Sequence, residues 1–207
     1  MGQDVLLEPA FVLHTRPYRN TSLIVELLTE SYGRQTVVAR SARGSRSRYQ
    51  GKLQLFVPLL VSFRGQGELK SLMSAELSGI PLDLLGRSMM CGFYLNELLV
   101  RLMQKSDEHR QIYLIYVKTL YRLVDSSDIE SDLRIFEKAL LSELGYGLNL
   151  AVEANTRETI CAQQYYRYVA EQGFILLHKK TEGPDVYSGD SIKALDQEEW
   201  DTVAQKK

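Results

Sequence analysis

The sequence predicts a mixed α+β protein, with β structure in the first eighty residues and mainly helix in the remainder. Before Pro81, short apolar and β-branched runs alternate with turn residues, which is typical of strands. After Pro81, apolar residues recur at helical spacing. Hydrophobic residues make up 44% and charged residues 25% of the 207 positions, as in folded globular chains. We therefore expect two domains, residues 1–80 and 81–207.

Five candidate strands account for the N-terminal domain, at residues 10–15, 22–28, 34–40, 53–64 and 68–77. The stretches Glu30–Gly33 and Gly65–Gly67 are turn-like, and Pro58 suggests a bulge, an edge position or a break inside the fourth run. Five short strands in this span have the size of a small barrel. The pattern favours a five-stranded OB-fold, although an SH3-like barrel fits the same strands.

Three helices and a small hairpin are expected in the second domain. Helical spacing covers residues 84–103 and 108–124, and Ser127–Glu130 fits a capping box that opens a third helix. Gly145 stands where a left-handed residue ends that helix. A β-hairpin is expected around residues 165–178, and a last helix within residues 188–203.

The bulk properties restrict the function classes. The apolar runs are too short to span a bilayer, and no signal peptide is recognisable at the N-terminus. Two isolated cysteines, Cys91 and Cys161, are most simply reduced, buried thiols of a cytoplasmic protein. The net charge of −1 decides nothing by itself.

Basic residues are concentrated in the first domain. Between Arg34 and Lys70 there are eight cations and one acidic residue, Glu68. The segment 39–52 holds five of these cations with three serines, two glycines and one tyrosine. Arginine binds phosphate oxygens bidentately, and a serine- and glycine-rich backbone can follow a phosphate chain. A solvated loop without function is the plainer interpretation of the same composition.

The candidate DNA-binding residues follow from this bias. Tyr49 is included as a ring on which a base could stack. Arg16 and Arg19 are outer members, for which an ordinary surface role is equally consistent. The full set is Arg16, Arg19, Arg34, Arg40, Arg43, Arg46, Arg48, Tyr49, Lys52, Arg64 and Lys70.

Catalytic and metal chemistry find little support in the sequence. The cysteines and the three histidines do not form the close pairs that zinc sites use, so no metal and no cofactor are expected. Neither a nucleophile-elbow motif nor a phosphate-loop motif occurs. We therefore expect a protein that is not an enzyme.

An ordered set of motifs resembles the RecO DNA-repair family. In the first domain these are residues 10–23 (AFVLHTRPYRNTSL), 29–34 (TESYGR), 38–43 (VARSAR), 53–60 (LQLFVPLL) and 65–70 (GQGELK). In the second domain they are residues 92–99 (GFYLNELL), 134–141 (RIFEKALL) and 144–147 (LGYG). Each motif is weak alone, but their order along residues 10–180 is specific.

The resemblance implies a recombination mediator with an N-terminal OB-fold. It implies binding of single- and double-stranded DNA and annealing of complementary strands. It also implies contact with the C-terminal tail of the single-stranded-DNA-binding protein (SSB), a complex with RecR, and through these an indirect role in loading RecA. The location implied is cytoplasmic and associated with the nucleoid. Arg134 and Lys138, one helical turn apart, are the candidates for the acidic SSB tail.

Two departures from the family pattern qualify these expectations. Many members carry a four-cysteine zinc site after the third helix, whereas residues 148–173 contain only Cys161, which implies the branch without zinc. Relatives usually continue with another helix and a basic tail, whereas this sequence ends at Lys207. It is thus C-terminally short, and contacts made by such a tail are expected to be missing.

Three rival functions remain consistent with the residues. The chain could be a protein-interaction adaptor with little DNA affinity, or an RNA-binding OB-fold protein, because no base-specific pattern is readable. A thiol hydrolase using Cys161 is the third. DNA binding that depends on salt, and activity that survives Cys161→Ala, would separate the mediator from the adaptor and the hydrolase.

Overall fold

The structure is a computed structural model that describes residues 3–179 and 181–199. Its contacts divide the chain into two compact units, one up to Ser127 and one from Asp128 onward. The chain changes from strand to helix near Pro81, well before the boundary between the units. The first two helices belong to the first unit because they contact the barrel.

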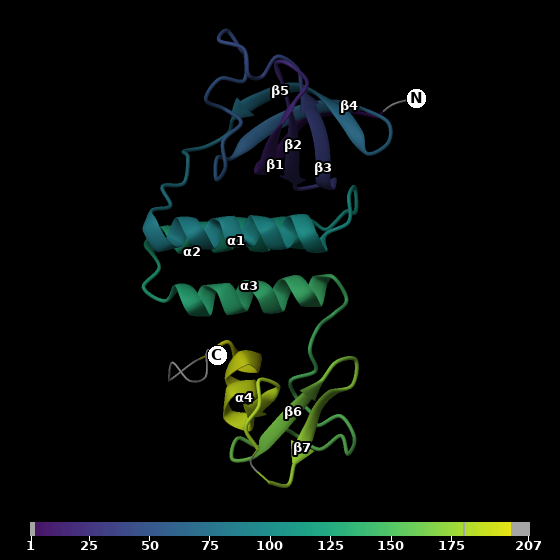
Figure 1. The fold of residues 1–207 in the computed structure, drawn as a ribbon, viewed down its shortest axis with the longest axis vertical. Coiled ribbons are helices and arrows are strands. Elements are labelled where there is room, and N and C mark those ends of the chain that lie inside the picture. The colour runs from purple at the N-terminus through teal and green to yellow at the C-terminus, as the bar shows by residue number, and fades with distance from the viewer. Residues whose placement is uncertain (1–2, 180, 200–207) are drawn as a thin grey trace. The chain divides into compact units, whose positions relative to one another are not determined.

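A closed barrel of five strands forms the N-terminal part of the first unit, and it confirms the predicted OB-type fold (Figure 1). The strands close in the order β1-β2-β3-β5-β4. All neighbours are antiparallel except β3 and β5, which pair in parallel. The strands are β1 (Gln3–Tyr18), β2 (Ser22–Thr29), β3 (Gly33–Ala39), β4 (Leu59–Gly65) and β5 (Leu69–Leu77).

Two strands differ from the sequence prediction. β1 begins at Gln3 rather than at residue 10, and it pairs with both β4 and β2 through irregularities after Val5 and Val12. The fourth run breaks before Leu59, where Phe56 has a φ of 62° and Pro58 follows. Phe56 and Val57 are nevertheless buried, so the apolar character that suggested a strand reflects packing outside the sheet.

Two helices, α1 (Gly86–Leu102) and α2 (Arg110–Asp125), pack on the barrel. Asn96 is buried in α1, and its Nδ2 donates to the carbonyl oxygen of Leu13 in β1 at 3.0 Å. The hydroxyl of Tyr116 donates to Asn96 Oδ1 at 2.6 Å, and its ring lies edge-on to Phe11 at 5.6 Å between centroids. Helices and barrel are thus joined by a satisfied buried polar bridge as well as by apolar packing.

The loop between α1 and α2 docks against the β2–β3 turn. The backbone N–H of Ser106 donates to the carbonyl oxygen of Arg34 at 2.8 Å. At Gly33, where φ is +60°, a Cβ would lie 1.7 Å from the carbonyl oxygen of Asp107. The approach of the loop therefore requires a residue without a side chain at this turn.

The second unit begins with α3 (Ile129–Glu143). Its N-cap is Asp128, which accepts from the N–H of Ser131 at 3.3 Å, whereas the capping-box prediction put the cap one residue earlier. The helix ends at Glu143, and Gly145 follows it as the predicted left-handed residue, with a φ of +83°. The N–H of Tyr146 bonds back to the carbonyl oxygen of Leu141 at 2.8 Å, as in a Schellman ending.

A three-stranded sheet of order β7-β6-β8 and a short helix complete this unit. β6 (Tyr165–Val169) and β7 (Gly173–Leu177) form the predicted hairpin. β8 (Val186–Ser188) was not predicted because three residues carry too little pattern, and α4 (Gly189–Gln197) lies within the range expected to be helical. Residues 200–203 of that prediction lie outside the described residues.

Glu153 fixes the loop that precedes the hairpin. Its Oε2 accepts from the N–H groups of Asn155 and Thr156 at 2.8 and 2.5 Å, and its Oε1 accepts from the N–H of Leu176 in β7 at 3.2 Å. These hydrogen bonds, led by that from Thr156, hold the pKa of the Glu153 carboxyl below its usual value. A single carboxylate therefore ties the loop to the sheet.

Candidate nucleic-acid interface

Residues 40–52, which follow β3 and which we call the basic loop, form a series of turns attached to the barrel. The N–H of Arg43 donates to the carbonyl oxygen of Thr21 in the β1–β2 turn at 2.8 Å. Within the segment, the N–H of Gly44 donates to Ser41 O at 3.2 Å, and that of Ser47 donates to Gly44 O at 3.0 Å. The arginines of this segment are therefore presented by a folded loop.

Tyr49 anchors this loop in the barrel. Its side chain belongs to the barrel core, the residue is 3% exposed, and its hydroxyl donates to the carbonyl oxygen of Leu72 at 2.9 Å. Burial raises the pKa of Tyr49, an effect that the neighbouring Arg48 opposes. The prediction that Tyr49 stacks on a base does not hold in this structure, because its ring is enclosed.

Arg48 contacts the side chain of Tyr49. Its Nη2 donates to the Tyr49 hydroxyl at 2.8 Å, and its guanidinium carbon lies 4.9 Å from the centre of the ring. The hydrogen bond and the cation–π contact orient an exposed arginine, so less side-chain entropy is lost when it binds an anion.

A first pocket of about 550 Å³ crosses the parallel β3–β5 pair and the β1–β2 turn. It combines cations, among them Arg19 and Arg40, with three serine hydroxyls. The guanidinium of Arg19 lies 5.1 Å from the ring centre of Tyr18. The lining residues are Tyr18, Arg19, Ser22, Val38, Arg40, Ser41, Leu69, Lys70 and Ser71.

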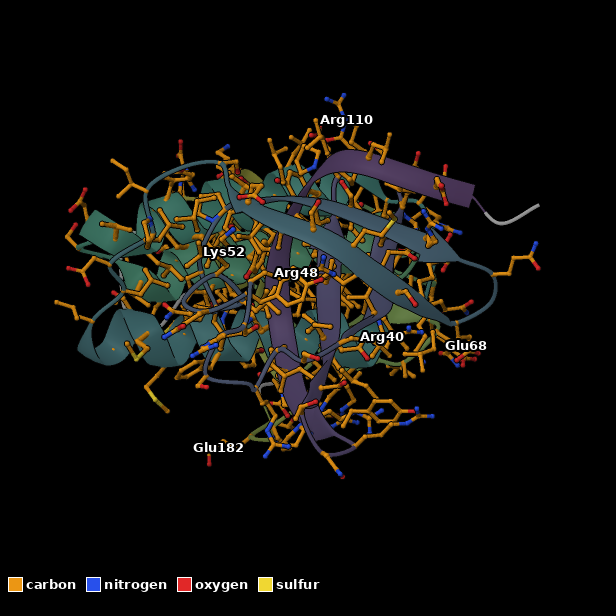
Figure 2. The ribbon with its side chains drawn as sticks, turned by 90° about the horizontal axis from the view of Figure 1, so that it is seen from above. Arg40, Arg48, Lys52, Glu68, Arg110 and Glu182 are labelled. Carbon is orange, nitrogen blue, oxygen red and sulfur yellow. The ribbon has the colours of Figure 1, made fainter. Side chains whose placement is uncertain are left out.

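A second pocket of about 330 Å³ adjoins the first and shares Arg40 and Ser71 with it. Three arginines from different segments meet there: Arg40 after β3, Arg48 in the basic loop and Arg64 in β4. We call the two adjoining pockets the β3–β5 groove. Figure 2 shows Lys52, Arg48 and Arg40 following one another across the barrel, with Arg110 at a distant margin.

The remaining predicted residues lie outside the lining of the groove. Arg16, Arg43 and Arg46 are exposed, and within the described residues they form no ion pair. Lys52 is paired with Glu76 at 2.9 Å. These four cations can extend a positive surface beyond the two pockets.

Arg34 has a structural position. The residue is 9% exposed, its Nη1 lies 3.3 Å from Glu26 Oε2, and its Nε donates to the carbonyl oxygen of Met103 at 3.1 Å. Its side chain joins β2, β3 and the end of α1. The interpretation of Arg34 as an exposed phosphate contact is therefore withdrawn.

Sequence reasoning missed the hydroxyl groups of the groove. Ser22, Ser41 and Ser71 come from three separate segments and converge only because β3 and β5 pair in parallel. Serines beside arginines are ordinary hydrogen-bond donors to phosphate oxygens. In the sequence each of these serines lies within three residues of a basic residue, which was the available signal. Only the pairing of the strands shows that the three serines lie together.

The two residues assigned to the SSB tail are engaged within the second unit. Arg134 Nη1 lies 2.6 Å from Glu137 Oε2. The ammonium of Lys138 donates to the carbonyl oxygens of Leu195 and Asp196 at 3.1 and 2.7 Å, and to Glu198 Oε1 at 3.1 Å. An ammonium has three donors, so Lys138 is fully used at the C-terminal end of α4.

Other chemistry is weakly represented in the described part of the chain. No group of three or more histidine, cysteine, aspartate or glutamate residues there could hold a metal ion. The expectation that both cysteines are buried is wrong: Cys91 is partly buried and Cys161 is exposed, with its Sγ 3.6 Å from the carbonyl oxygen of Thr159. None of the helices in residues 3–179 and 181–199 has the length and apolar character of a membrane-spanning segment.

The closed barrel and the arginine-lined groove define an OB-fold protein with a surface suited to polyanions. Comparison with known proteins gives its family. The model described as "Recombination protein O N terminal" matches residues 4–81, and "Recombination protein O C terminal" matches residues 86–197. The chain therefore belongs to the recombination protein O (RecO) family, which acts in DNA repair and recombination.

Curated relatives agree over most of the chain. A protein named DNA repair protein RecO from Coxiella burnetii is 50% identical over 198 residues, which are 96% of this chain and 85% of the relative. Relatives of the same name are 44% identical in Nitrosococcus oceani and 42% identical in Methylococcus capsulatus. These cover 92% and 96% of this chain, and 78% and 81% of the relatives.

Proposed function

We propose that this chain is a non-catalytic recombination mediator that binds single- and double-stranded DNA through the β3–β5 groove and the basic loop. It would anneal complementary strands and, with RecR and SSB, help to load RecA. The observation that supports DNA binding most directly is the position of Arg40. This exposed arginine lines both pockets of the groove, between Arg19 in one and Arg48 and Arg64 in the other.

The lining of the groove favours phosphates over bases. Guanidinium groups and hydroxyls bind phosphate oxygens, and these contacts carry no sequence information. Tyr18 is the aromatic residue in the lining of the groove and is half-buried beside Arg19, whereas Tyr49, beneath Arg48, is buried. Binding should therefore depend little on base sequence.

Contact with phosphates is also what strand annealing requires. A strand held by its backbone keeps its base edges exposed for pairing, and neutralised phosphates reduce the repulsion between two strands. The exposed arginines Arg16, Arg43 and Arg46 could contact the second strand.

For SSB, the proposed contact is between its acidic C-terminal tail and Arg134 and Lys138. Each cation already has a carboxylate partner, Glu137 and Glu198 respectively. A peptide carboxylate would therefore replace an internal one. Glu198→Gln should tighten binding of an acidic SSB-tail peptide, and an unchanged affinity would count against this location.

Fluorescence anisotropy of a labelled oligo-dT, titrated from 50 to 200 mM salt, tests DNA binding. If four or five phosphates are neutralised, affinity should fall roughly 50- to 130-fold over this range. Replacement of Arg43, Arg46 and Arg48 by alanine should flatten the dependence. Arg110→Ala is the matched control, because Arg110 lies away from the groove and is paired with Glu30 at 2.6 Å (Figure 2).

Failure to bind the oligonucleotide at 50 mM salt would overturn the DNA-binding proposal and favour a protein adaptor. Equal binding of an oligo-U of the same length would leave the groove as a general single-strand site. Stronger binding of oligo-U would favour RNA as the ligand.

A further inference from the structure

A third hollow, of about 770 Å³, lies at the start of β5, between the β4–β5 turn and the α1–α2 loop. It is a part of the first unit and is separate from the basic loop. Three cations line it: Arg34, Lys70 and Lys105. Polar groups from both loops, among them Gln66 and Ser106, complete the lining.

Two of the three cations are neutralised by carboxylates. Arg34 is paired with Glu26, whose oxygens also accept from Thr36 Oγ1 at 3.1 and 3.0 Å. Lys105 Nζ lies 2.9 Å from Glu68 Oε2. Glu68 is the acidic residue of the pocket lining, and it is carried by the β4–β5 turn.

Lys70 is the cation left over. Its ammonium contacts the neutral groups Gln35 Oε1 and Ser106 Oγ, the latter at 3.4 Å, and it lies 5.6 Å from the ring centre of Phe63. Among the described residues it forms no ion pair. Partial burial lowers the pKa of Lys70, as expected for an ammonium that has lost water without gaining an anion.

The ion pair between Glu68 and Lys105 is exposed to solvent and is therefore easily broken. The side chain of Glu68 is 79% exposed, whereas that of its partner Lys105 is 34% exposed. The carboxylate therefore reaches in from solvent, and solvent-exposed pairs of this kind contribute little to stability. A more highly charged anion can replace it at small cost.

We propose that this hollow is a second phosphate-binding site, in which Glu68 occupies Lys105 until a phosphate group displaces it and bridges Lys70 and Lys105. The phosphate that binds there is either a backbone phosphate of bound nucleic acid or a free phosphate ion. The first source rests on the function proposed above. Lys70 also lines the β3–β5 groove, so a strand lying in that groove would be adjacent to this site.

The nucleic-acid source is tested with Glu68→Gln in the full chain. Removal of the carboxylate takes away the group that a phosphate must displace, so the affinity for oligo-dT at 50 mM salt should rise above that of the wild type. Because Lys105 then carries one uncompensated charge, the affinity should also fall by a further factor of roughly 2.6 between 50 and 200 mM salt. Glu182→Gln is the matched control, because it removes the same charge from an exposed residue of the second unit. Lys105→Gln combined with Glu68→Gln should abolish the gain.

The free-phosphate source is tested by NMR of the Cε signals of Lys70 and Lys105, identified through Lys70→Arg and Lys105→Arg. Inorganic phosphate is compared with chloride at equal ionic strength. Saturable shifts of both signals with phosphate, and tighter saturation in Glu68→Gln, are expected. Glu68 is exposed, so this variant should fold normally.

The outcomes separate this site from the groove. Suppose that the arginine variants weaken oligonucleotide binding, that Glu68→Gln and Glu182→Gln bind equally well, and that phosphate shifts the signal of neither lysine. This result would overturn the second site and leave the DNA-binding proposal intact. Saturable shifts in a protein that binds no oligonucleotide would support a site for free phosphate and overturn the DNA proposal.

Discussion

The hydroxyl of Tyr49, in the basic loop, donates to the carbonyl oxygen of Leu72 in β5 at 2.9 Å. This bond fastens the loop to the strand that forms one side of the β3–β5 groove. The geometry of the arginines on the loop therefore depends on a buried side chain that cannot itself contact a ligand.

Tyr49→Phe and Tyr49→Ala should separate the hydrogen bond from the packing. The first removes one buried bond and should lower the free energy of unfolding by about 1 kcal/mol. The second also empties a place in the barrel core and should cost about 3–5 kcal/mol. Urea denaturation measures both. Oligo-dT affinity should fall more in Tyr49→Ala, and equal stabilities of the two variants would contradict the anchoring role.

Arg40→Ala should weaken oligo-dT binding and lower the slope of log affinity against log salt by about 0.7, the value for one lost phosphate contact on a single strand. Arg40 lines both pockets, whereas Arg110 lines neither. Anisotropy at four salt concentrations, with Arg110→Ala measured in parallel, checks this. The same slope in both variants would mean that the groove does not position the phosphates.

Gly33→Ala should destabilise the first unit far more than Gly51→Ala. Both glycines have positive φ, so both substitutions incur the left-handed penalty of about 1–2 kcal/mol. Only at Gly33 would the new Cβ collide with backbone, at 1.7 Å from Asp107 O, whereas Gly51 has open space. Thermal unfolding should show the difference, and equal losses would place the α1–α2 loop elsewhere.

Asn96→Ala should cost more than Tyr116→Phe. Asn96 satisfies both the Leu13 carbonyl and the Tyr116 hydroxyl, so its removal leaves two buried polar groups unpaired, at about 1–3 kcal/mol each. Tyr116→Phe removes one bond and leaves only the Asn96 oxygen. Urea denaturation of both variants and their double mutant gives the coupling energy, which should be clearly non-zero.

Glu153 should make the second unit sensitive to acid. Because its folded-state pKa is lowered, its contribution is present above the unfolded value of about 4.3 and is lost as pH falls through the lower folded value. The stability difference between the wild type and Glu153→Gln should thus be largest near neutral pH and narrow below about pH 4. Urea unfolding at several pH values checks this, with Glu182→Gln, at an exposed residue outside these hydrogen bonds, measured in parallel as the control.

Local patterns were enough to predict much of this fold. Five strands, the helices and the 165–178 hairpin follow from periodicity and turn residues, because each is dictated by neighbours in the sequence. The start of β1 and the short β8 were missed, since Leu6 and Leu7 are exposed in β1 and β8 has only three residues.

The site was predictable in its charge but not in its geometry. Tyr49 stands in a polar segment, so nothing local indicates that the barrel core takes its ring. For Arg34 the register decides: the structure pairs Thr29 with Gly33, so Arg34 lies opposite Leu28 and on the same face as Glu26. The predicted turn over Glu30–Gly33 would instead have paired Thr29 with Arg34, so this contact did not follow from the sequence. Convergence of Arg40, Arg48 and Arg64 required the closure of the barrel.

That closure depends on a short seam. β3 and β5 are joined by only three residue pairs, from Thr36–Leu69 to Val38–Ser71, whereas β2 and β3 share seven. Segments held by few contacts are the ones that open locally, and we therefore expect the barrel to open at this seam. An anion held between Arg40 on one side of the seam and Ser71 on the other would cross-link it, so occupancy and barrel closure are thermodynamically coupled. Hydrogen exchange of the β3 and β5 amides that bond across this seam would then slow on binding, so the shortest ladder of the barrel would report whether ligand is bound.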